Sequence, residues 1–558
     1  MLRKVLIAAA LAAVAALPAG ASRGRTAQVT TQSLLMPGVS YERRAEFTPH
    51  GPVVLDIVTA PKPDGSLYTL TPLLSDNAIV GTKTLSEMEK DVSASGTVVG
   101  VNGDFYTANP GKPSGMLMSG GAIESAPVTN RASLGIGSDG TLTVAKVAFD
   151  GTWRGTGQRR QFDLNAPPVK GHTTVYTQAW GPLTPAESGV VIDVIGTMPP
   201  LAPNAVAAGV VTQALDHGPV AIPPGGAVIV ARGNQAPHLA QEAPIGTTVE
   251  LRPILTPNWS TMAAAIGGGP LLVADGKPVF RSRESFAAPL LNQRSARSAV
   301  GQLADGRIVF VTVEGGGVAY SAGMTNYELA VALAQLGART AMGLGTGTSA
   351  SMSFDGTPLT RAAEQPISDA LVLSYTGVYA AEPSSPTLSP NGDGVDDQET
   401  FTYKVVRPSQ VTASVVGPSA TQVLAQAAQQ PGTYTLQWNG SAAAEGDWRF
   451  TVSAVDDAGR TTTADRTFSL NDTLGALHVT PANPGLTASF QLAHPATVTV
   501  SVEKPNGIVV ATLFTKKLDA GAQTATWHGR AAGYRVRVIA SNSIGKATLV
   551  APVGTRRP

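Results

Sequence analysis

The sequence predicts an α+β fold, in which a strand-rich first domain is followed by two all-β sandwich modules. Short runs of alternating apolar and polar residues recur from residue 41 to about 375, separated by Gly, Asn and Asp, which is typical of strands joined by turns. Only residues 325–336 have a clear helical pattern. After residue 380 a tryptophan-containing pattern occurs twice, which indicates two related modules.

The composition excludes several classes of protein. Hydrophobic residues make up 43% and charged residues 14% of the 558 residues, which is typical of a globular chain rather than a disordered one. Lys and Arg number 40 against 39 Asp and Glu, and this balance argues against a nucleic-acid partner. The chain has no cysteine. Disulfides, thiolate metal sites and a cysteine nucleophile are therefore excluded.

The first 21 residues have the pattern of a signal peptide. Arg3 and Lys4 precede an apolar run over residues 5–17, and residues 19–21 form the small-x-small pattern that precedes cleavage. An uncleaved membrane anchor is the alternative, but this run is shorter than the about 20 residues that span a bilayer. We therefore expect a secreted protein, extracellular or associated with the cell wall, that keeps no stable membrane anchor. The polar residues 22–40 are interpreted as a leader or linker.

The first domain is placed at residues 41–380. Residues 53–58 and 307–313 are apolar and rich in β-branched side chains, which predicts buried strands. In the helix, Thr325 and Glu328 have the spacing of a capping box, and Gly337 follows its last turn.

The remaining chain is divided into a linker at 381–388 and modules at 389–473 and 474–558. The segment that ends at Trp438 resembles the segment that ends at Trp527, and each is followed by a second matching strand pattern. One small β-sandwich per repeat is expected.

An oxygen-rich loop opens the first module. Asn391, Asp393, Asp396 and Asp397 alternate with glycines at short intervals, as the ligands of calcium loops do. The full spacing of an EF-hand is absent, so calcium and a plain Asx-rich turn remain equal interpretations. The segment resembles the opening of immunoglobulin-like modules in secreted bacterial proteins, including the flagellar hook-capping type.

Four glycine-bearing clusters in the first domain are candidates for a site. Each has an ordinary structural explanation: a hairpin turn, a glycine bend, a solvated arginine, or a packed turn. Each also has a chemical one, because flexible backbone, amides, hydroxyls and a guanidinium group all bind sugars or phosphates. The clusters are Val101–Tyr106, Gly267–Leu272, Arg294–Gly301 and Met342–Met352.

Taken together and in this order, the clusters resemble the phosphodiester glycosidase family, from about Gly96 to Tyr375. The sequences NGDFY, GGGPLLVADGKPV and RSAVG are similar to family blocks, as is the helix that leads into the glycine-rich loop. The loop itself departs from the family pattern, since Gly343 and Gly345 stand where the family typically has Asn and Asp. The departure affects the expected activity rather than the expected fold.

The resemblance implies hydrolysis of a sugar-1-phosphodiester, with water attacking the anomeric carbon. In this interpretation Arg297 clamps the phosphate, and Asp104 or Glu314 orients or deprotonates water. The residues assigned to substrate binding share backbone amides or small polar groups, and they are Asn102, Gly103, Gly268, Gly269, Ser298, Thr348 and Ser349.

Two functions follow from the sequence. The first is a hydrolase acting on phosphodiester-linked glycans of walls or other extracellular polymers. The second is a degenerate relative that binds such glycans without cleaving them, as the loss of the loop Asp at Gly345 suggests. No cofactor is required by the proposed chemistry, and no HxH, HExxH or GxSxG motif indicates a histidine metal site or a serine hydrolase.

Overall fold

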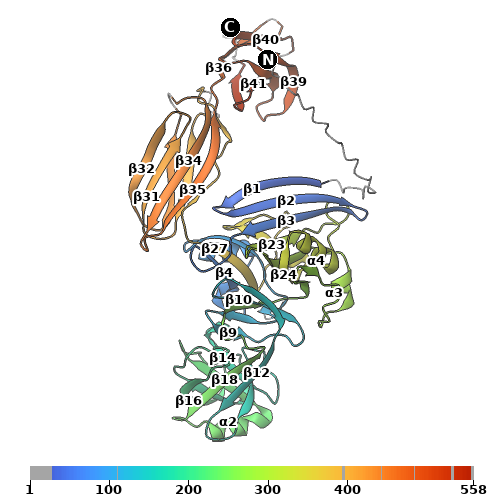
Figure 1. Cartoon of the computed structure of the whole chain (residues 1–558), viewed down its shortest axis with the longest axis vertical. Coiled ribbons are helices and arrows are strands. Elements are labelled where there is room, and N and C mark those ends of the chain that lie inside the picture. Colours follow the sequence, from blue (N-terminus) through green and yellow to red (C-terminus); the bar gives the residue numbers. More distant parts are fainter. Residues whose placement is uncertain are drawn as a thin grey trace, which may run out of the picture.

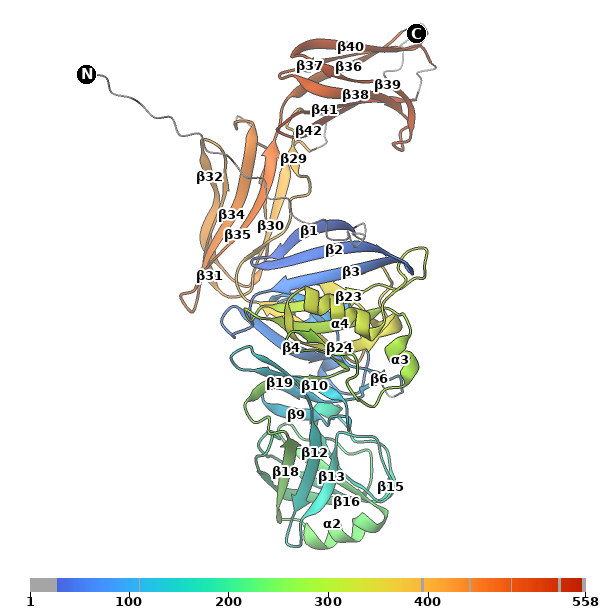
Figure 2. The same cartoon turned by 45° about the vertical axis from the view of Figure 1, so that its right-hand side comes forward.

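The computed structural model describes residues 28–109, 111–392, 396–440, 443–482, 484–529 and 533–553. The predicted signal peptide at 1–21 lies outside these ranges. Four units follow one another along the long axis: a barrel, the two-sheet body of the first domain, and two C-terminal modules (Figures 1 and 2). Most of the described chain is β-strand, as the sequence predicts. Within these ranges no helix has the length and apolar character needed to cross a membrane.

The body of the first domain contains two sheets packed face to face. The larger has eight strands in the order β1 (Gln28–Met36), β2 (Val39–Thr48), β3 (Gly51–Ala60), β23 (Ile308–Val313), β22 (Arg297–Leu303), β24 (Ala338–Thr346), β20 (Leu271–Ala274) and β21 (Lys277–Pro278). The smaller has five, in the order β26 (Thr357–Pro358), β25 (Met352–Phe354), β5 (Thr97–Asn102), β27 (Asp369–Tyr375) and β4 (Tyr68–Leu74).

Apolar side chains from both sheets form one core, which includes Val58 and Phe310 from the larger sheet and Val99 and Leu371 from the smaller. Helix α4 (Asn326–Gln335) covers the opposite face of the larger sheet. Helix α1 (Leu85–Val92) packs on the smaller sheet. The domain body is therefore a stack of four layers.

Helix α4 begins as the sequence predicts. Thr325 is its N-cap and Glu328 completes the capping box, while Gly337 follows its C-cap with φ of +92°. A glycine tolerates this left-handed conformation without steric cost, which explains why the helix ends there.

The interpretation of residues 22–40 as a leader or linker is wrong from residue 28 onward. Residues 28–36 form β1, which pairs antiparallel with β2 at the edge of the larger sheet. An edge strand with one exposed face needs little apolar sequence, and most of the described part of β1 is exposed. This is why its polar composition resembled that of a linker.

A third sheet connects the domain body to a closed barrel that the sequence did not indicate. The sheet has the order β11 (Leu142–Lys146), β10 (Ala132–Gly137), β19 (Met262–Gly267), β8 (Leu117–Ser119) and β9 (Ala122–Ser125). The barrel has the order β12 (Ala148–Arg154), β13 (Arg160–Leu164), β14 (Thr173–Thr177), β17 (Ala227–Arg232), β15 (Ser188–Ile195), β16 (Ala207–His217) and β18 (Thr248–Thr256).

Strand β12 leads into the barrel directly after β11, and β18 leaves it before β19; Ala148 and Thr256 are opposite each other in the register. Short elements complete the domain: α2 (Ala236–Glu242) beside the barrel, α3 (Ala288–Asn292) beside α4, and the strand pair β6 (Tyr106–Thr107) and β7 (Lys112–Pro113).

Each C-terminal module consists of two packed sheets with a shared core. The first has β28 (Tyr379–Ala380), β30 (Glu399–Val405) and β33 (Gly432–Trp438) facing β29 (Thr387–Leu388), β35 (Thr461–Leu470), β34 (Gly446–Asp456), β31 (Ser409–Val416) and β32 (Thr421–Gln429). The second has β36 (Leu474–Pro481), β37 (Leu486–Leu492) and β40 (Gly521–Trp527) facing β39 (Val509–Leu518), β38 (Ala496–Glu503), β41 (Arg535–Ser541) and β42 (Lys546–Pro552).

The repeat seen in the sequence has a structural counterpart. Trp438 ends β33 opposite the first residue of β30, and Trp527 ends β40 opposite the first residue of β37. The two tryptophans thus occupy equivalent positions. The segment predicted as a linker at 381–388 contains β29, and module 1 already begins with β28, ten residues before its predicted start at 389.

Candidate active site

The four clusters meet at the end of β24. The amide of Gly345 donates a hydrogen bond to the carbonyl of Gly103 (2.8 Å), and the amide of Gly269 donates to the carbonyl of Gly343 (2.8 Å). The amide of Gly347 donates to the carbonyl of Ala296 (2.9 Å). Segments separated by up to about 240 positions in the sequence are therefore joined by main-chain hydrogen bonds.

Gly345, at the position of the family's loop Asp, has no room for a side chain. A Cβ atom there would lie 2.8 Å from Nδ2 of Asn102 and 3.0 Å from the carbonyl oxygen of Asp104. Asn102 is buried and donates from Nδ2 to the carbonyl of Gly345 (3.1 Å), while its Oδ1 accepts from the amide of Ser351 (3.1 Å). The Asn102 side chain therefore ties two loops together and is not free to bind a sugar.

Arg297 does not have the geometry of a phosphate clamp. Its side chain is buried, and its guanidinium group donates to the carbonyls of Met324, Leu290 and Gln293 and to Oδ1 of Asn326. Burial lowers the pKa of Arg297 to about 10. Because its donors are directed at protein oxygens, Arg297 fixes the segments before β22 and α4. Its neighbour Ser298 is also buried, 3.4 Å from Oγ1 of Thr312.

The glycines at 267–269 do not form an open anion cradle. The amide of Gly267 donates to the carbonyl of Met116 (2.6 Å), and that of Gly269 is bonded to Gly343. The carbonyl of Gly268 accepts from Arg131 (3.1 Å). These glycines allow close packing of three segments, which is the structural explanation that the sequence left open.

Asp104 forms a buried pair with Asp369. Asp104 accepts from the amides of Phe105 (2.7 Å) and Gly115 (2.6 Å), and Arg131 lies 3.3 Å from it. Oδ1 of Asp369 accepts from the amide of Asp104 (3.0 Å). Burial raises the pKa of both carboxyls, and the charge of Asp104 raises that of Asp369 further. The pair organises the loop after β5, and Asp104 does not reach the pocket described next.

A pocket of about 420 Å³ opens beside the glycine-rich loop. Three of its lining residues follow strands of the larger sheet: Glu314 directly follows β23, and Gly347 and Thr348 lie in the turn after β24. Thr348 is exposed and lines this pocket, whereas Oγ of Ser349 donates to the carbonyl of Thr346 (3.1 Å). The other polar lining residues come from three further loops, and they are Arg294, Ser295, Ser321 and Thr360.

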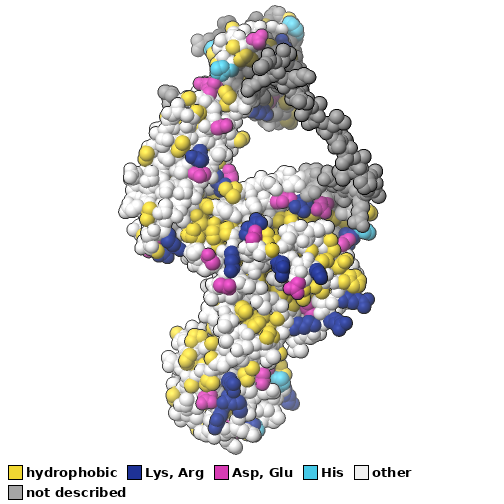
Figure 3. All heavy atoms as spheres, viewed as in Figure 1, with side chains coloured by type: hydrophobic (Ala, Val, Ile, Leu, Met, Phe, Trp, Pro, Cys, Tyr) yellow, Lys and Arg dark blue, Asp and Glu magenta, His cyan; other side chains and the backbone are white. Residues whose placement is uncertain are grey.

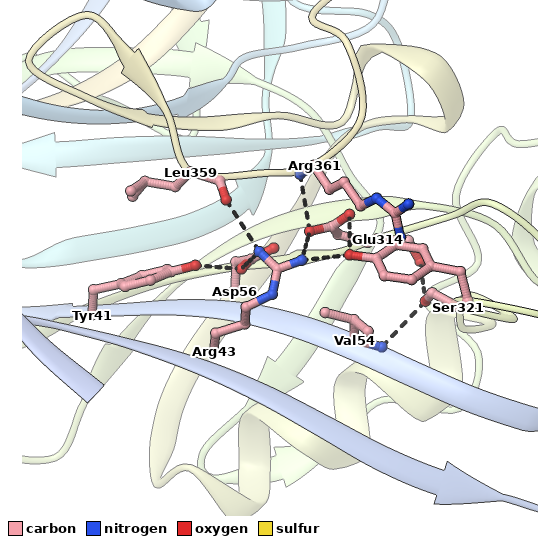
Figure 4. Close-up of polar contacts among 9 residues, drawn as sticks. Tyr41, Arg43, Val54, Asp56, Glu314, Ser321, Leu359 and Arg361 are labelled. Atoms are coloured by element: carbon pink, nitrogen blue, oxygen red, sulfur yellow. Dashed lines mark hydrogen bonds and ion pairs between the residues drawn. The ribbon is translucent and has the colours of Figure 1, made fainter. Parts of the chain in front are cut away.

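Glu314 is the predicted catalytic residue that the structure places at a pocket. Its Oε1 accepts from Nη2 of Arg43 (2.6 Å) and from the amide of Arg361 (3.1 Å), and its Oε2 accepts from the hydroxyl of Tyr320 (2.9 Å). Figure 4 shows Arg43 between Glu314 and Asp56. The donors hold the carboxylate in one orientation at the edge of the inter-sheet core.

Asp56 is the second carboxylate of this network. It accepts from the Tyr41 hydroxyl (2.6 Å) and from Nη1 of Arg43 (3.2 Å), which also donates to the carbonyl of Leu359 (3.2 Å) (Figure 4). Burial raises the pKa of Asp56 to about 7. Arg43 thus bridges two carboxylates, one on β3 and one directly after the adjacent strand β23.

Sequence reasoning missed Arg43, Asp56, Tyr320 and Arg361. Asp56 carried a signal, because it is a charged residue inside the apolar run at 53–58 of a buried strand. Arg43 carried none, since β2 has an ordinary mixture of charged and apolar residues.

The proposed calcium loop is only partly described, because Asp393 lies outside the described residues. Nδ2 of Asn391 donates to Oγ of Ser389 (3.0 Å), and Oδ1 of Asp397 accepts from the amide of Gly392 (2.7 Å). Within the described part of the chain, no group of three or more His, Cys, Asp or Glu side chains is arranged to hold a metal.

Comparison with known proteins supports the resemblance found in the motifs. Residues 202–374 match the sequence model of the phosphodiester glycosidase family. This range includes three of the four clusters, while the one at 101–106 precedes it. A search of curated proteins gives no match.

Among solved structures, a hypothetical protein from Synechocystis matches with 28% identity and a TM-score of 0.51, over 61% of this chain and 62% of its own. A putative exported protein from Burkholderia pseudomallei matches with 16% identity and a TM-score of 0.50, over 63% of this chain and 97% of its own. The catalytic domain of zebrafish N-acetylglucosamine-1-phosphodiester alpha-N-acetylglucosaminidase, auto-inhibited by its pro-peptide, matches with 12% identity and a TM-score of 0.33, over 62% of this chain and 87% of its own.

Proposed function

From the match of residues 202–374 to the phosphodiester glycosidase family, we propose that the first domain hydrolyses sugar-1-phosphodiester linkages in cell-wall or other extracellular glycans. The observation that carries the proposal is the position of Glu314, whose carboxylate is held at the wall of the pocket beside the glycine-rich loop. A carboxylate, a flexible hydroxyl-bearing loop and nearby arginines are the groups that this reaction needs.

Arg294 lines the pocket and two further arginines are bonded to Glu314 at its wall, which favours an anionic substrate. Arg294 lines it, Arg43 is paired with Glu314, and the exposed Arg361 lies over the Tyr320 ring at 4.4 Å from its centroid. Guanidinium groups bind phosphate oxygens through paired hydrogen bonds. Arg361 is therefore the candidate for the role that the sequence had assigned to Arg297, because the guanidinium group of Arg294 is already bonded to Glu328 and to the carbonyl of Gly323.

In the proposed reaction, the bond between the anomeric carbon and the phosphate oxygen breaks, and the oxygen of a water forms the new bond to that carbon. Glu314 orients this water and accepts its proton. The phosphate leaves as a monoester, and its developing charge is stabilised by the arginines. Because a phosphomonoester is a better leaving group than an alcohol, a second carboxylic acid to protonate it is less important than in ordinary glycosidases.

The test is release of reducing sugar from a panel of sugar-1-phosphodiesters. Glu314→Gln should lower kcat by about 10²-fold or more, the usual contribution of a general base. Glu250→Gln, which changes a carboxylate on the barrel paired with Arg159, is the matched control and should leave kcat unchanged. Full activity of a folded Glu314→Gln variant would remove Glu314 from the mechanism.

A glycan-binding protein without catalysis is the second candidate. It is favoured by Gly345, because the family's loop Asp is absent and the space is closed by Asn102 and Asp104. Glycan binding by a wild-type protein that cleaves none of the diesters would support this function. Introducing Asp at position 345 is a poor test of it, since the new side chain would displace Asn102.

Export and calcium binding are part of the same proposal. Cleavage after Ala21 is tested by sequencing the N-terminus of the secreted protein. Calorimetry with calcium on the full chain tests the loop at 391–397, where an absence of heat would favour the Asx-rich turn. The immunoglobulin-like modules would act as spacers or carbohydrate-binding appendages.

A further inference from the structure

A second pocket, of about 650 Å³, lies beside α3 and the start of α4. Its volume is within the range of small-molecule sites, about 300–1,000 Å³. It adjoins the pocket of Glu314, because Arg294 lines that pocket and forms an ion pair with Glu328, which lines the second one. The motifs found in the sequence do not explain it.

Two aromatic rings stand exposed at this second pocket. Phe280 is 69% exposed and Tyr327 is 42% exposed. Their ring centroids are 5.1 Å apart with an interplanar angle of 88°. An exposed aromatic pair that lines a pocket offers an apolar surface for a ligand to cover.

The same rim carries two available positive charges. The Arg281 guanidinium lies 5.6 Å from the centroid of the Phe280 ring, and Arg283 follows two residues later. Among the described residues, neither guanidinium group has a carboxylate partner within 4.0 Å. In Figure 3, dark-blue and yellow side chains lie together on the right of the view, where Figure 1 places α3.

The two carboxylates of the pocket are already bonded within the protein. Glu284 accepts from the amides of Leu271 (2.7 Å) and Ala132 (2.8 Å). Glu328 accepts from the amide of Thr325 (2.9 Å) and pairs with Arg294. The charges left for a ligand are therefore those of the arginines, and they favour an anion.

We propose that the second pocket binds a phosphate-bearing sugar unit. The apolar face of the sugar ring covers Phe280 and Tyr327, and the phosphate is bound by Arg281 and Arg283. Ser282 and Asn292, which also line the pocket, supply hydrogen bonds to sugar hydroxyls. The choice of a sugar rests on the proposed function; the two adjoining pockets then hold neighbouring units of one glycosyl-phosphate polymer.

The test measures binding of an oligomer of three glucosyl phosphate units to the full chain by calorimetry. The double variant Arg281→Gln/Arg283→Gln and the single variant Phe280→Ala should each weaken this binding about tenfold or more. Arg252→Gln and Phe47→Ala change exposed residues of the same types on β18 and β2 and should have no effect. Unchanged thermal unfolding shows that the variants are folded.

Hydrolysis of a small substrate, the methyl diester of glucose 1-phosphate, is measured on the same proteins. It should be unchanged in the variants, because this diester fills only the pocket of Glu314. A wild type that binds the oligomer but cleaves no diester contradicts the proposed function and leaves the second pocket supported. The proposal for the second pocket is overturned if the wild type and the variants bind the oligomer with equal affinity. It is also overturned if the wild type binds neutral maltotriose as tightly as the oligomer, or does not bind the oligomer.

Discussion

At the scale of single residues, the hydrogen-bond partners of each side chain decide whether it remains a candidate for binding or catalysis. The sequence assigned Arg297 and Asn102 to substrate binding, yet their polar groups are used by protein partners. Glu314 is also bonded, but at the wall of a pocket. A buried polar group that has no hydrogen-bond partner is costly. Most buried polar side chains are therefore bonded within the protein and stabilise the fold.

Gly345→Ala should destabilise the first domain by about 1–3 kcal/mol, the usual cost of overpacking. The added Cβ would lie 2.8 Å from the Asn102 amide nitrogen and 3.0 Å from a backbone oxygen, and the backbone has little freedom to move. Urea unfolding measures the change. Gly475→Ala, where the Cβ meets nothing within 4 Å, is the control, and equal effects of the two substitutions would contradict the packing argument.

The pKa of Asp56 predicts a pH dependence of stability. Burial raises this pKa from 3.8 to about 7, so between these values the folded chain holds a proton that the unfolded chain has lost. The contribution of Asp56 to the free energy of unfolding therefore decreases as pH rises from about 4 to about 7, and is constant above that.

The measurement is urea unfolding of wild type and Asp56→Asn across this window. The variant lacks the titrating group, so the difference in stability between the two proteins should change with pH below about 7 and stay constant above it. Other buried carboxyls with raised pKa values, such as Glu89, affect both proteins equally. Parallel curves across the whole window would show that Asp56 titrates alike in the folded and unfolded chains.

At the scale of elements, helix α4 connects local sequence to the site. Its capping box fixes Thr325 next to Met324, whose carbonyl accepts from Arg297. The start of the helix and the start of β22 are therefore held together.

Thr325→Ala should cost about 1 kcal/mol of stability through loss of the N-cap, measured by thermal unfolding. Thr325→Ser keeps the capping oxygen and should remain close to wild type. If Ser and Ala destabilise equally, the loss comes from the methyl group rather than from the cap.

Elements differ in how far the sequence predicts them. The capping box and the terminal glycine predicted both ends of α4 to within one residue, because both signals are local in the sequence. The resemblance assigned residues of all four clusters to one reaction, and main-chain hydrogen bonds join these clusters in the structure. The network at Glu314 was not, because Arg43 comes from a strand 271 positions away in the sequence. Only the paired sheet places such residues together, and a single sequence does not show which strands pair.

At the scale of the whole molecule, Arg466 forms hydrogen bonds that connect the first C-terminal module to the body of the first domain. It donates to the carbonyls of Leu34 and Leu35 in β1 and of Ala380, and it pairs with Glu382. Lys404 adds an ion pair with Asp355 at 2.8 Å. A buried arginine with partners on both units couples their unfolding.

Arg466→Gln should separate the unfolding of module 1 from that of the first domain. Calorimetry should then show an additional transition at lower temperature, because the variant loses charge-assisted hydrogen bonds worth about 1.5–3 kcal/mol each. Arg449→Gln, an exposed arginine of the same module, should leave the trace unchanged. An identical trace for Arg466→Gln would mean that the units are coupled by other contacts.

The barrel leaves the domain body and returns to it at Ala148 and Thr256, which face each other in one strand pair. The two ends of the barrel segment therefore leave and rejoin the domain body side by side. The barrel also shares apolar cores with the domain body, since Met116 belongs to one core with Trp153, and Ile79 belongs to another with Tyr176. Removing the barrel would therefore leave two adjacent chain ends, but it would also expose apolar side chains of the domain body.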